Sequence, residues 1–99
     1  TSLSFTPIGR YETCPVGTYK VALVVSNSDY HWYRQDADGL WSHKRGTTPV
    51  KRTDESGELI IDPMIADRDD YSTFVGFFAV KPWNNIYNSS KGSPQCQRI

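Results

Sequence analysis

The chain has 99 residues, with 11 basic and 11 acidic side chains that give a formal net charge of zero at pH 7. A balanced chain has no overall field to attract nucleic acid or an anionic membrane. Its longest purely apolar run, Val21–Val25, is far shorter than the ~18 residues that a membrane-spanning helix needs. The chain begins at Thr1 without an initiator Met. We therefore expect a single small domain over residues 1–99, or the C-terminal part of a larger or processed protein, with no nucleic-acid and no membrane partner.

Two neighbouring strands are predicted in the first half of the chain. Thr18–Val25 (TYKVALVV) is rich in β-branched and aromatic residues and is bounded by turn residues, which is typical of a buried strand. Asp29–Asp36 follows too soon for a helical crossover, so the two strands should be antiparallel. Leu40–Lys44 then returns after a turn, which predicts a hairpin over residues 29–44.

The length of the hairpin loop decides which side chains share a face. A three-residue loop ending at Gly39 fits a type I turn followed by a G1 bulge, and this register places Tyr33 opposite His43. Side chains alternate along a strand, and cross-strand partners point the same way. One face then carries His31, Tyr33, Gln35, Trp41 and His43, and the other carries Tyr30, Trp32, Arg34, Ser42 and Lys44.

Weaker patterns follow the hairpin. Val50–Arg52 is expected to pair briefly, and Glu58–Ile61 (ELII) is predicted as a short strand after a turn. Asp62–Asp70 is predicted to be a loop or a single helical turn with Asp62 as its cap, because the acidic end disfavours a longer helix.

The second strong strand is predicted at Tyr71–Lys81 (YSTFVGFFAVK). Its apolar residues on both faces favour a central place in the sheet. Residues 82–99 are rich in Asn, Ser, Gly and Pro and are expected to wrap the surface. The fold class is therefore mainly β or α+β, a small antiparallel sheet with a central hairpin at residues 29–44 and little or no helix.

Two features indicate a secreted or extracellular protein. A disulfide between Cys14 and Cys96 would close a loop of about 80 residues and stabilise the fold by ~4 kcal/mol in the chain-entropy model. Asn88 begins an N-glycosylation sequon, Asn-Ser-Ser. The alternative is a cytosolic protein with two unpaired thiols.

The two histidines, His31 and His43, are the sharpest chemical signal. Histidine can act as a general base near neutral pH when a second group holds its ring in one tautomer. The alternative is that both are ordinary polar residues on a solvent-exposed face of the sheet. Neither Asp29 nor Asp36 completes a recognised metal-ligand spacing, so we expect no metal and no other cofactor.

The stretch from Thr18 to Val50 resembles the C-terminal sheet of the NlpC/P60 branch of papain-like cysteine hydrolases. An apolar strand, His31, a Gly-containing turn, Trp41 and then His43 carry the resemblance. It implies amide-bond cleavage, with His31 as the catalytic base and His43 as the group that orients it. The family's nucleophile lies on a helix upstream of the first histidine, whereas Cys14 is followed by no helical pattern. The resemblance therefore implies a nucleophile on a missing segment, an upstream domain or a partner chain.

Aromatic content supports a second hypothesis, in which the chain is a secreted, non-catalytic binding module. Flat amphipathic rings bind sugars and partner proteins. The candidate binding residues for a peptide or glycan ligand are Tyr33, Trp41, Trp83 and Tyr87. The alternative is that these rings form the core of a small domain that has few Leu residues. The sequence leaves open whether the protein is an enzyme.

Overall fold

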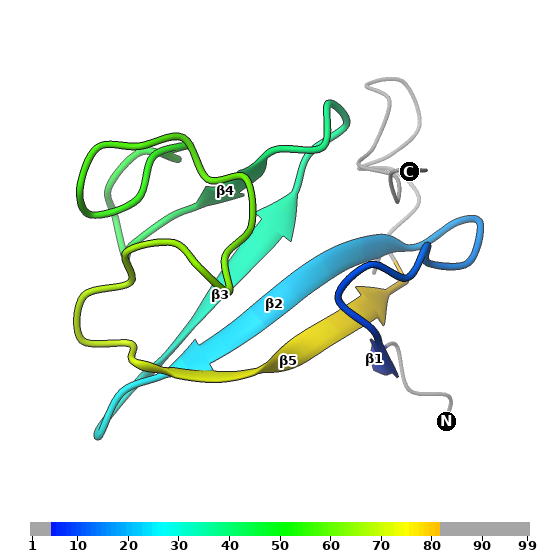
Figure 1. The fold of residues 1–99 in the computed structure, drawn as a ribbon, viewed down its shortest axis with the longest axis horizontal. Coiled ribbons are helices and arrows are strands. Elements are labelled where there is room, and N and C mark those ends of the chain that lie inside the picture. Colours follow the sequence, from blue (N-terminus) through cyan, green and yellow to red (C-terminus); the bar gives the residue numbers. More distant parts are fainter. Residues whose placement is uncertain (1–4, 82–99) are drawn as a thin grey trace.

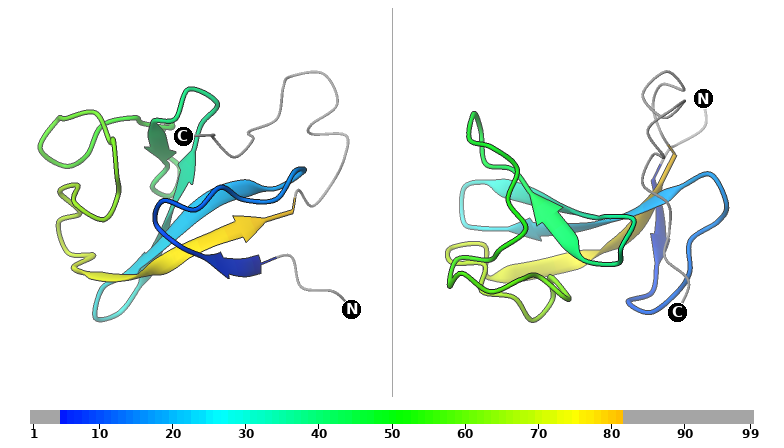
Figure 2. Two further views of the ribbon diagram at one scale, coloured as in Figure 1. Left: turned by 45° about the vertical axis from the view of Figure 1, so that its right-hand side comes forward. Right: turned by 90° about the horizontal axis from the view of Figure 1, so that it is seen from above.

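A computed structural model describes residues 5–81 as one five-stranded antiparallel sheet with the strand order β1-β5-β2-β3-β4 (Figure 1). Its strands are β1 (Phe5–Ile8), β2 (Tyr19–Val25), β3 (Tyr30–Gln35), β4 (Trp41–His43) and β5 (Thr73–Val80). The predicted fold class is confirmed, since the described residues form an antiparallel sheet without a helix. β2 lies in the middle of the sheet, and the β3–β4 hairpin extends from it to one edge, as the further views in Figure 2 also show.

The predicted register of the β3–β4 hairpin is confirmed. The Asp36 N–H donates to the Leu40 carbonyl at 2.8 Å, which closes the three-residue loop, and Gly39 has a φ of 90°. Only glycine adopts this φ without a steric penalty. Tyr33 pairs with His43, so the two histidines share one face of the sheet.

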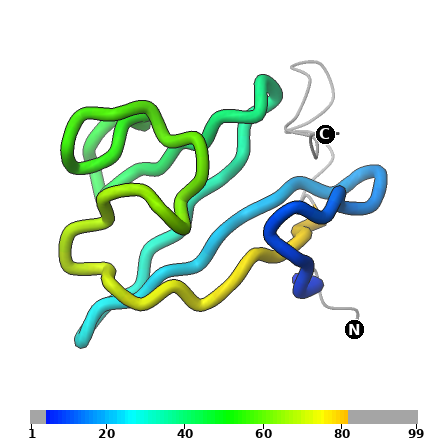
Figure 3. Tube along the Cα trace, in the orientation of Figure 1, coloured from blue at the N-terminus to red at the C-terminus, as the bar shows by residue number. Residues whose placement is uncertain are grey.

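A long segment between β4 and β5, residues 44–72, covers the face that carries the histidines; we call it the covering segment. Figure 3 traces it from the end of β4 back to the start of β5. It is attached to β4 by a hydrogen bond of 3.0 Å from the Trp41 N–H to the Ile60 carbonyl. Its Ile60 side chain is fully buried in the core cluster with Ala22, Val24, Tyr33, Trp41 and Phe77.

Within the covering segment, the prediction of a short strand at Glu58–Ile61 is wrong. Thr53 and Leu59 form only an isolated bridge. Only the central Ile60 is buried, while the Leu59 and Ile61 side chains on either side of it are exposed. The chain then turns at Asp62, whose carboxylate accepts the Met64 N–H at 2.9 Å as the predicted cap.

Other predictions downstream of the hairpin are confirmed. The brief pairing at Val50–Arg52 is seen as a bridge between His43 and Lys51. β5 has the central place that its composition predicted, between β1 and β2. A bulge interrupts the pairing of β5 with β2 between Leu23 and Val24.

The strand β1 was not predicted from the sequence. It is four residues long and contains Pro7, which has no N–H to donate to a sheet. At the edge of the sheet this lost donor is tolerated, because one side of an edge strand forms no ladder. The expectation that residues 82–99 wrap the surface lies outside the described residues.

Candidate functional site

The two histidines form a hydrogen-bonded chain from β3 to the covering segment. His31 Nε2 lies 2.9 Å from His43 Nδ1, and His43 Nε2 lies 2.9 Å from the Thr53 carbonyl oxygen. A carbonyl oxygen only accepts hydrogen bonds, so His43 Nε2 carries the proton and donates it. In neutral His43 the other ring nitrogen, Nδ1, is then an acceptor for the Nε2–H of His31. The contacts thus fix one tautomer for each ring.

Both imidazoles are buried, with 8% of His31 and 6% of His43 exposed, so the expectation of a solvent-exposed face is wrong. The His31 ring stacks on the Tyr71 ring at a centroid distance of 5.2 Å and meets the Tyr33 ring edge-on. Burial, followed by the neighbouring His43 and Arg45, lowers the pKa of His31 to about 4. His31 is therefore neutral at pH 7.

A cysteine nucleophile close to His31, which the hydrolase interpretation requires, is not found among residues 5–81. Cys14 precedes β2, whereas His31 pairs with Val24 near the other end of that strand. The five residue-to-residue steps from Tyr19 to Val24 span about 17 Å of strand. The described cysteine is therefore placed away from the imidazole that it would need as its base.

Two of the predicted binding residues belong to the hydrophobic core. Tyr33 is 2% exposed and Trp41 is 3% exposed, because the covering segment packs over their face of the sheet. Neither ring offers an exposed surface to a ligand in the described structure, and their role in binding stays a prediction. This outcome matches the alternative in which the aromatic rings build the core.

The other predicted site residues lie outside the described residues. These are Trp83, Tyr87, the sequon at Asn88, and Cys96. Cys14 is described and is buried at 5% exposure. The Cys14–Cys96 disulfide and the glycosylation of Asn88 therefore stay predictions.

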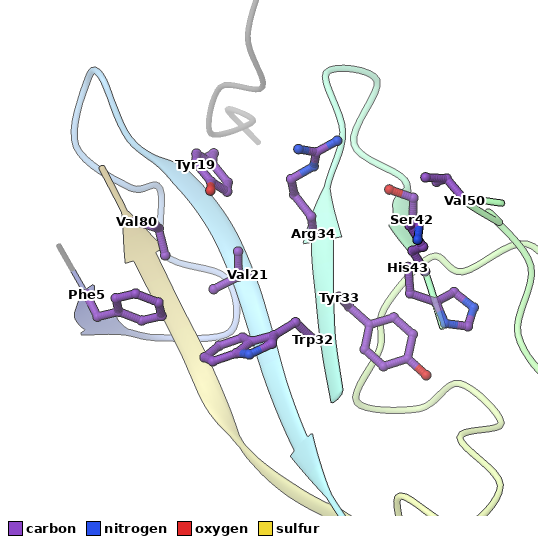
Figure 4. Close-up of a pocket in the computed structure, with 11 residues that line it drawn as sticks. Phe5, Tyr19, Val21, Trp32, Tyr33, Arg34, Ser42, His43, Val50 and Val80 are labelled. Atoms are coloured by element: carbon purple, nitrogen blue, oxygen red, sulfur yellow. The ribbon is translucent and has the colours of Figure 1, made fainter. Parts of the chain in front are cut away.

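An open groove of about 430 Å³ is lined mainly by residues of the opposite face of the sheet, and also by Tyr33 and His43 of the histidine face (Figure 4). We call it the aromatic groove; its lining residues are Phe5, Tyr19, Val21, Trp32, Tyr33, Arg34, Ser42, His43, Lys44, Val50 and Val80. All five described strands contribute to the lining, and Lys44 and Val50 come from the covering segment. The strand residues include Phe5 on β1, Val21 on β2, Trp32 on β3, Ser42 on β4 and Val80 on β5. The sequence did not predict Phe5, Trp32 or Arg34 as binding residues. The signal that could have found Trp32 and Arg34 is their alternation with the histidines along β3.

Residues 5–81 contain neither a cluster of metal ligands nor a membrane-spanning helix. No group of three or more His, Cys, Asp or Glu side chains in this range could hold a metal ion. The same residues include no helix with the length and apolar character needed to cross a membrane.

The sequence is similar to a protein of the mollusc Ruditapes philippinarum named insoluble matrix shell protein 1. The two are 56% identical over 63 residues, which make up 63% of this chain and 43% of the relative. The chain thus matches less than half the length of that relative. No protein-family model matches the sequence. No solved structure matches the chain.

These comparisons overturn the interpretation of the chain as part of an NlpC/P60 or papain-like hydrolase. The chain matches no such family model, and the relative that it resembles over most of its length is named as a shell matrix protein. The short pattern around His31 and His43 is therefore not evidence that the chain belongs to that hydrolase family. The catalytic roles of the two histidines were implied by that interpretation and are not retained.

Proposed function

We propose that this chain is a non-catalytic module of an insoluble extracellular matrix, in which it binds other matrix components. The observation that carries the proposal is the 56% identity over 63 residues with the Ruditapes philippinarum matrix shell protein. A matrix protein acts outside the cell, so the proposal includes a secreted or extracellular location for this chain. It retains the second hypothesis drawn from the sequence, a secreted binding module.

The histidine chain fits a structural role. The two rings connect β3, β4 and the covering segment through hydrogen bonds of 2.9 Å. Buried polar groups that are fully hydrogen-bonded favour one arrangement of the core over others. His31 and His43, which the sequence indicated as candidate catalytic residues, thus help to hold the covering segment on the sheet.

Exposed apolar side chains fit a binding role. In the covering segment, Ile61 and Ile65 are each 72% exposed, and Leu59 and Met64 are exposed beside them in the sequence. Large apolar side chains gathered on a surface commonly mark a contact with another molecule. A module that is built into a matrix needs contacts of this kind.

Co-sedimentation tests the proposal. The purified 99-residue chain is mixed with the insoluble organic matrix of demineralised Ruditapes philippinarum shells, and the pellet and supernatant are compared. We expect the chain in the pellet, and we expect an unrelated small β-domain of zero net charge to stay in the supernatant. Equal partitioning of the two proteins would contradict a matrix role. Antibody labelling of the source tissue provides a second check, because label confined to the cytoplasm would contradict the extracellular location.

A further inference from the structure

Three aromatic rings from distant parts of the chain meet on the sheet face that the covering segment leaves open. The ring centroids of Phe5 on β1 and Trp32 on β3 are 5.4 Å apart, and the ring of Phe78 on β5 lies 6.1 Å from Phe5 and 6.3 Å from Trp32. β2 runs between these strands and contributes Val21 to the floor. The rings therefore form a continuous apolar surface across β1, β5, β2 and β3.

The exposure of this face differs from that of the core face. Phe5 is 46% exposed, and Trp32 and Phe78 are half-buried, whereas Tyr33, Trp41 and Phe77 in the core under the covering segment are buried. Half-exposed rings of this kind present a flat apolar surface to a ligand at little cost in side-chain ordering.

The charged residues that line the aromatic groove are all cationic. They are Arg34, whose side chain is 49% exposed, and Lys44, and the described lining contains no carboxylate. Asp36 approaches Arg34 only at 3.9 Å, from outside the lining, so this exposed ion pair is weak. The Ser42 hydroxyl already donates to Asp36 at 3.1 Å. The Lys44 ammonium donates one of its three N–H groups to the Gly46 carbonyl, which leaves the other two for a ligand. The two cations are thus the main polar groups that the groove offers to a ligand.

We propose that the aromatic groove binds an anionic polysaccharide chain. Sugar rings would stack on Trp32 and Phe5, and the carboxylate or sulfate groups of the polymer would pair with Arg34 and Lys44. Charge complementarity favours this ligand over a neutral glycan, which would bring no negative charge to either cation, and an aromatic floor suits a pyranose ring better than a free inorganic anion. The proposal rests on the proposed matrix function and adds the ligand class and the site.

Affinity electrophoresis and isothermal titration of the full 99-residue chain test this assignment. The probes are polygalacturonate, which carries carboxylates, heparin, which carries sulfates as well, and neutral dextran. We expect binding of at least one of the two polyanions, weakening as salt is added, and no binding of dextran. The comparison of the two polyanions identifies the anionic group.

Variants assign the binding to the aromatic groove. We expect Trp32→Ala and Arg34→Gln each to weaken polyanion binding by about tenfold or more, as is usual for central aromatic and Arg contacts. Tyr11→Ala removes an exposed aromatic ring outside the groove, and Arg45→Gln removes one positive charge near the histidines. Both controls should bind like the unaltered chain. Thermal melts of every variant verify that it is folded, and if Trp32→Ala does not fold, Trp32→Phe and Arg34→Gln carry the test.

Each alternative outcome overturns the assignment in a recognisable way. Equal binding of dextran and the polyanions indicates a neutral glycan site. Polyanion binding that is lost in Arg45→Gln but kept in Arg34→Gln places the site in the neighbouring pocket of Arg45 and Tyr71, which shares Trp32 and Lys44 with the aromatic groove, and overturns the assignment. If no polysaccharide binds, the assignment is wrong. A chain that sediments with shell matrix but binds no polyanion overturns only this assignment, whereas a chain that binds polyanions but stays out of the matrix pellet overturns the proposed function.

Discussion

His31 Nε2 lies 2.9 Å from His43 Nδ1, and this contact is the first link of a chain that ends at the Thr53 carbonyl in the covering segment. The arrangement matches what a hydrolase would need for an oriented base. Its surroundings differ, because Tyr71 stacks on His31 and both imidazoles are buried. In an open cleft, this contact between the two histidines would orient a catalytic base. Here it attaches the covering segment to the sheet.

The first prediction concerns pH. Burial lowers the pKa of His31 to about 4, compared with 6.5 for an unperturbed histidine. Between pH 6.5 and pH 4, His31 is protonated in the unfolded chain but neutral in the folded chain. The contribution of this group to the free energy of unfolding is therefore complete above pH 6.5, decreases as the pH falls towards 4, and does not change further below pH 4. We expect a loss of about 3 kcal/mol between pH 7.5 and pH 4, measured by urea unfolding at pH 7.5, 5.5 and 4. The variant His31→Gln should show a smaller loss over the same range, and an identical loss would contradict the assignment to His31.

The second prediction concerns His43. His43→Ala removes the central link and leaves both the Thr53 carbonyl and the His31 Nε2–H without this partner. We expect a decrease of about 2–4 kcal/mol in the free energy of unfolding, because buried polar groups that lose their partners are costly. Denaturant unfolding measures the decrease, and Ser28→Ala, on an exposed turn, is the control with little expected change. A near-neutral His43→Ala would mean that the histidine chain does not hold the covering segment.

Sequence reasoning predicted the hairpin well because its information is local. A three-residue loop with Gly39 fixes the register, and strict alternation then places His31 and His43 together. The burial of the pair was not predictable in the same way. It depends on the covering segment, whose polar and turn-rich residues show no periodic pattern and whose contacts with the sheet are distant in sequence.

The aromatic groove shows the same limit. Alternation along the hairpin already grouped Trp32, Arg34, Ser42 and Lys44 on one face, and all four line the groove. Much of the remaining lining comes from Phe5 on β1, which is short and contains Pro7, and from Val80 on β5, which is about 40 residues farther along the chain than β3. The aromatic residues that were chosen from the hairpin, Tyr33 and Trp41, point to the other face and into the core.

The third prediction concerns Asp54, whose carboxylate organises the covering segment. Partial burial opposes its ionisation, but hydrogen bonds from the backbone N–H groups of Asp67, Glu58 and Ser56 and from the Ser56 hydroxyl lower its pKa to about 2. Asp54→Ala removes all of these acceptors, and we expect a destabilisation of about 1–3 kcal/mol at pH 7. Thermal or urea unfolding measures it. Asp70→Ala, which removes an exposed carboxylate nearby, should change stability little, so similar effects of the two substitutions would argue against a special role for Asp54.

The fourth prediction concerns the cysteines. We expect Cys14 and Cys96 to be joined in the mature protein, since Cys14 is buried at 5% exposure and an extracellular location preserves disulfides. The intact mass under non-reducing conditions should then increase by two hydrogens after reduction. Reduction should also lower the midpoint of thermal unfolding, because it releases a long loop in the unfolded chain. A mass that does not change on reduction would contradict the prediction.

The fifth prediction separates the two faces of the sheet through their tryptophans. Trp41 is 3% exposed and its ring packs 5.7 Å from that of Phe77, whereas Trp32 lines the open groove. Trp41→Ala should cost about 3–5 kcal/mol of stability, because it leaves a cavity under the covering segment that the backbone cannot fill. Trp32→Ala removes less buried area and should cost clearly less, and iodide should quench Trp32 more than Trp41. Single-Trp variants with Trp83→Phe make the quenching assignable, and equal costs with equal quenching would mean that both faces of the sheet are covered in solution.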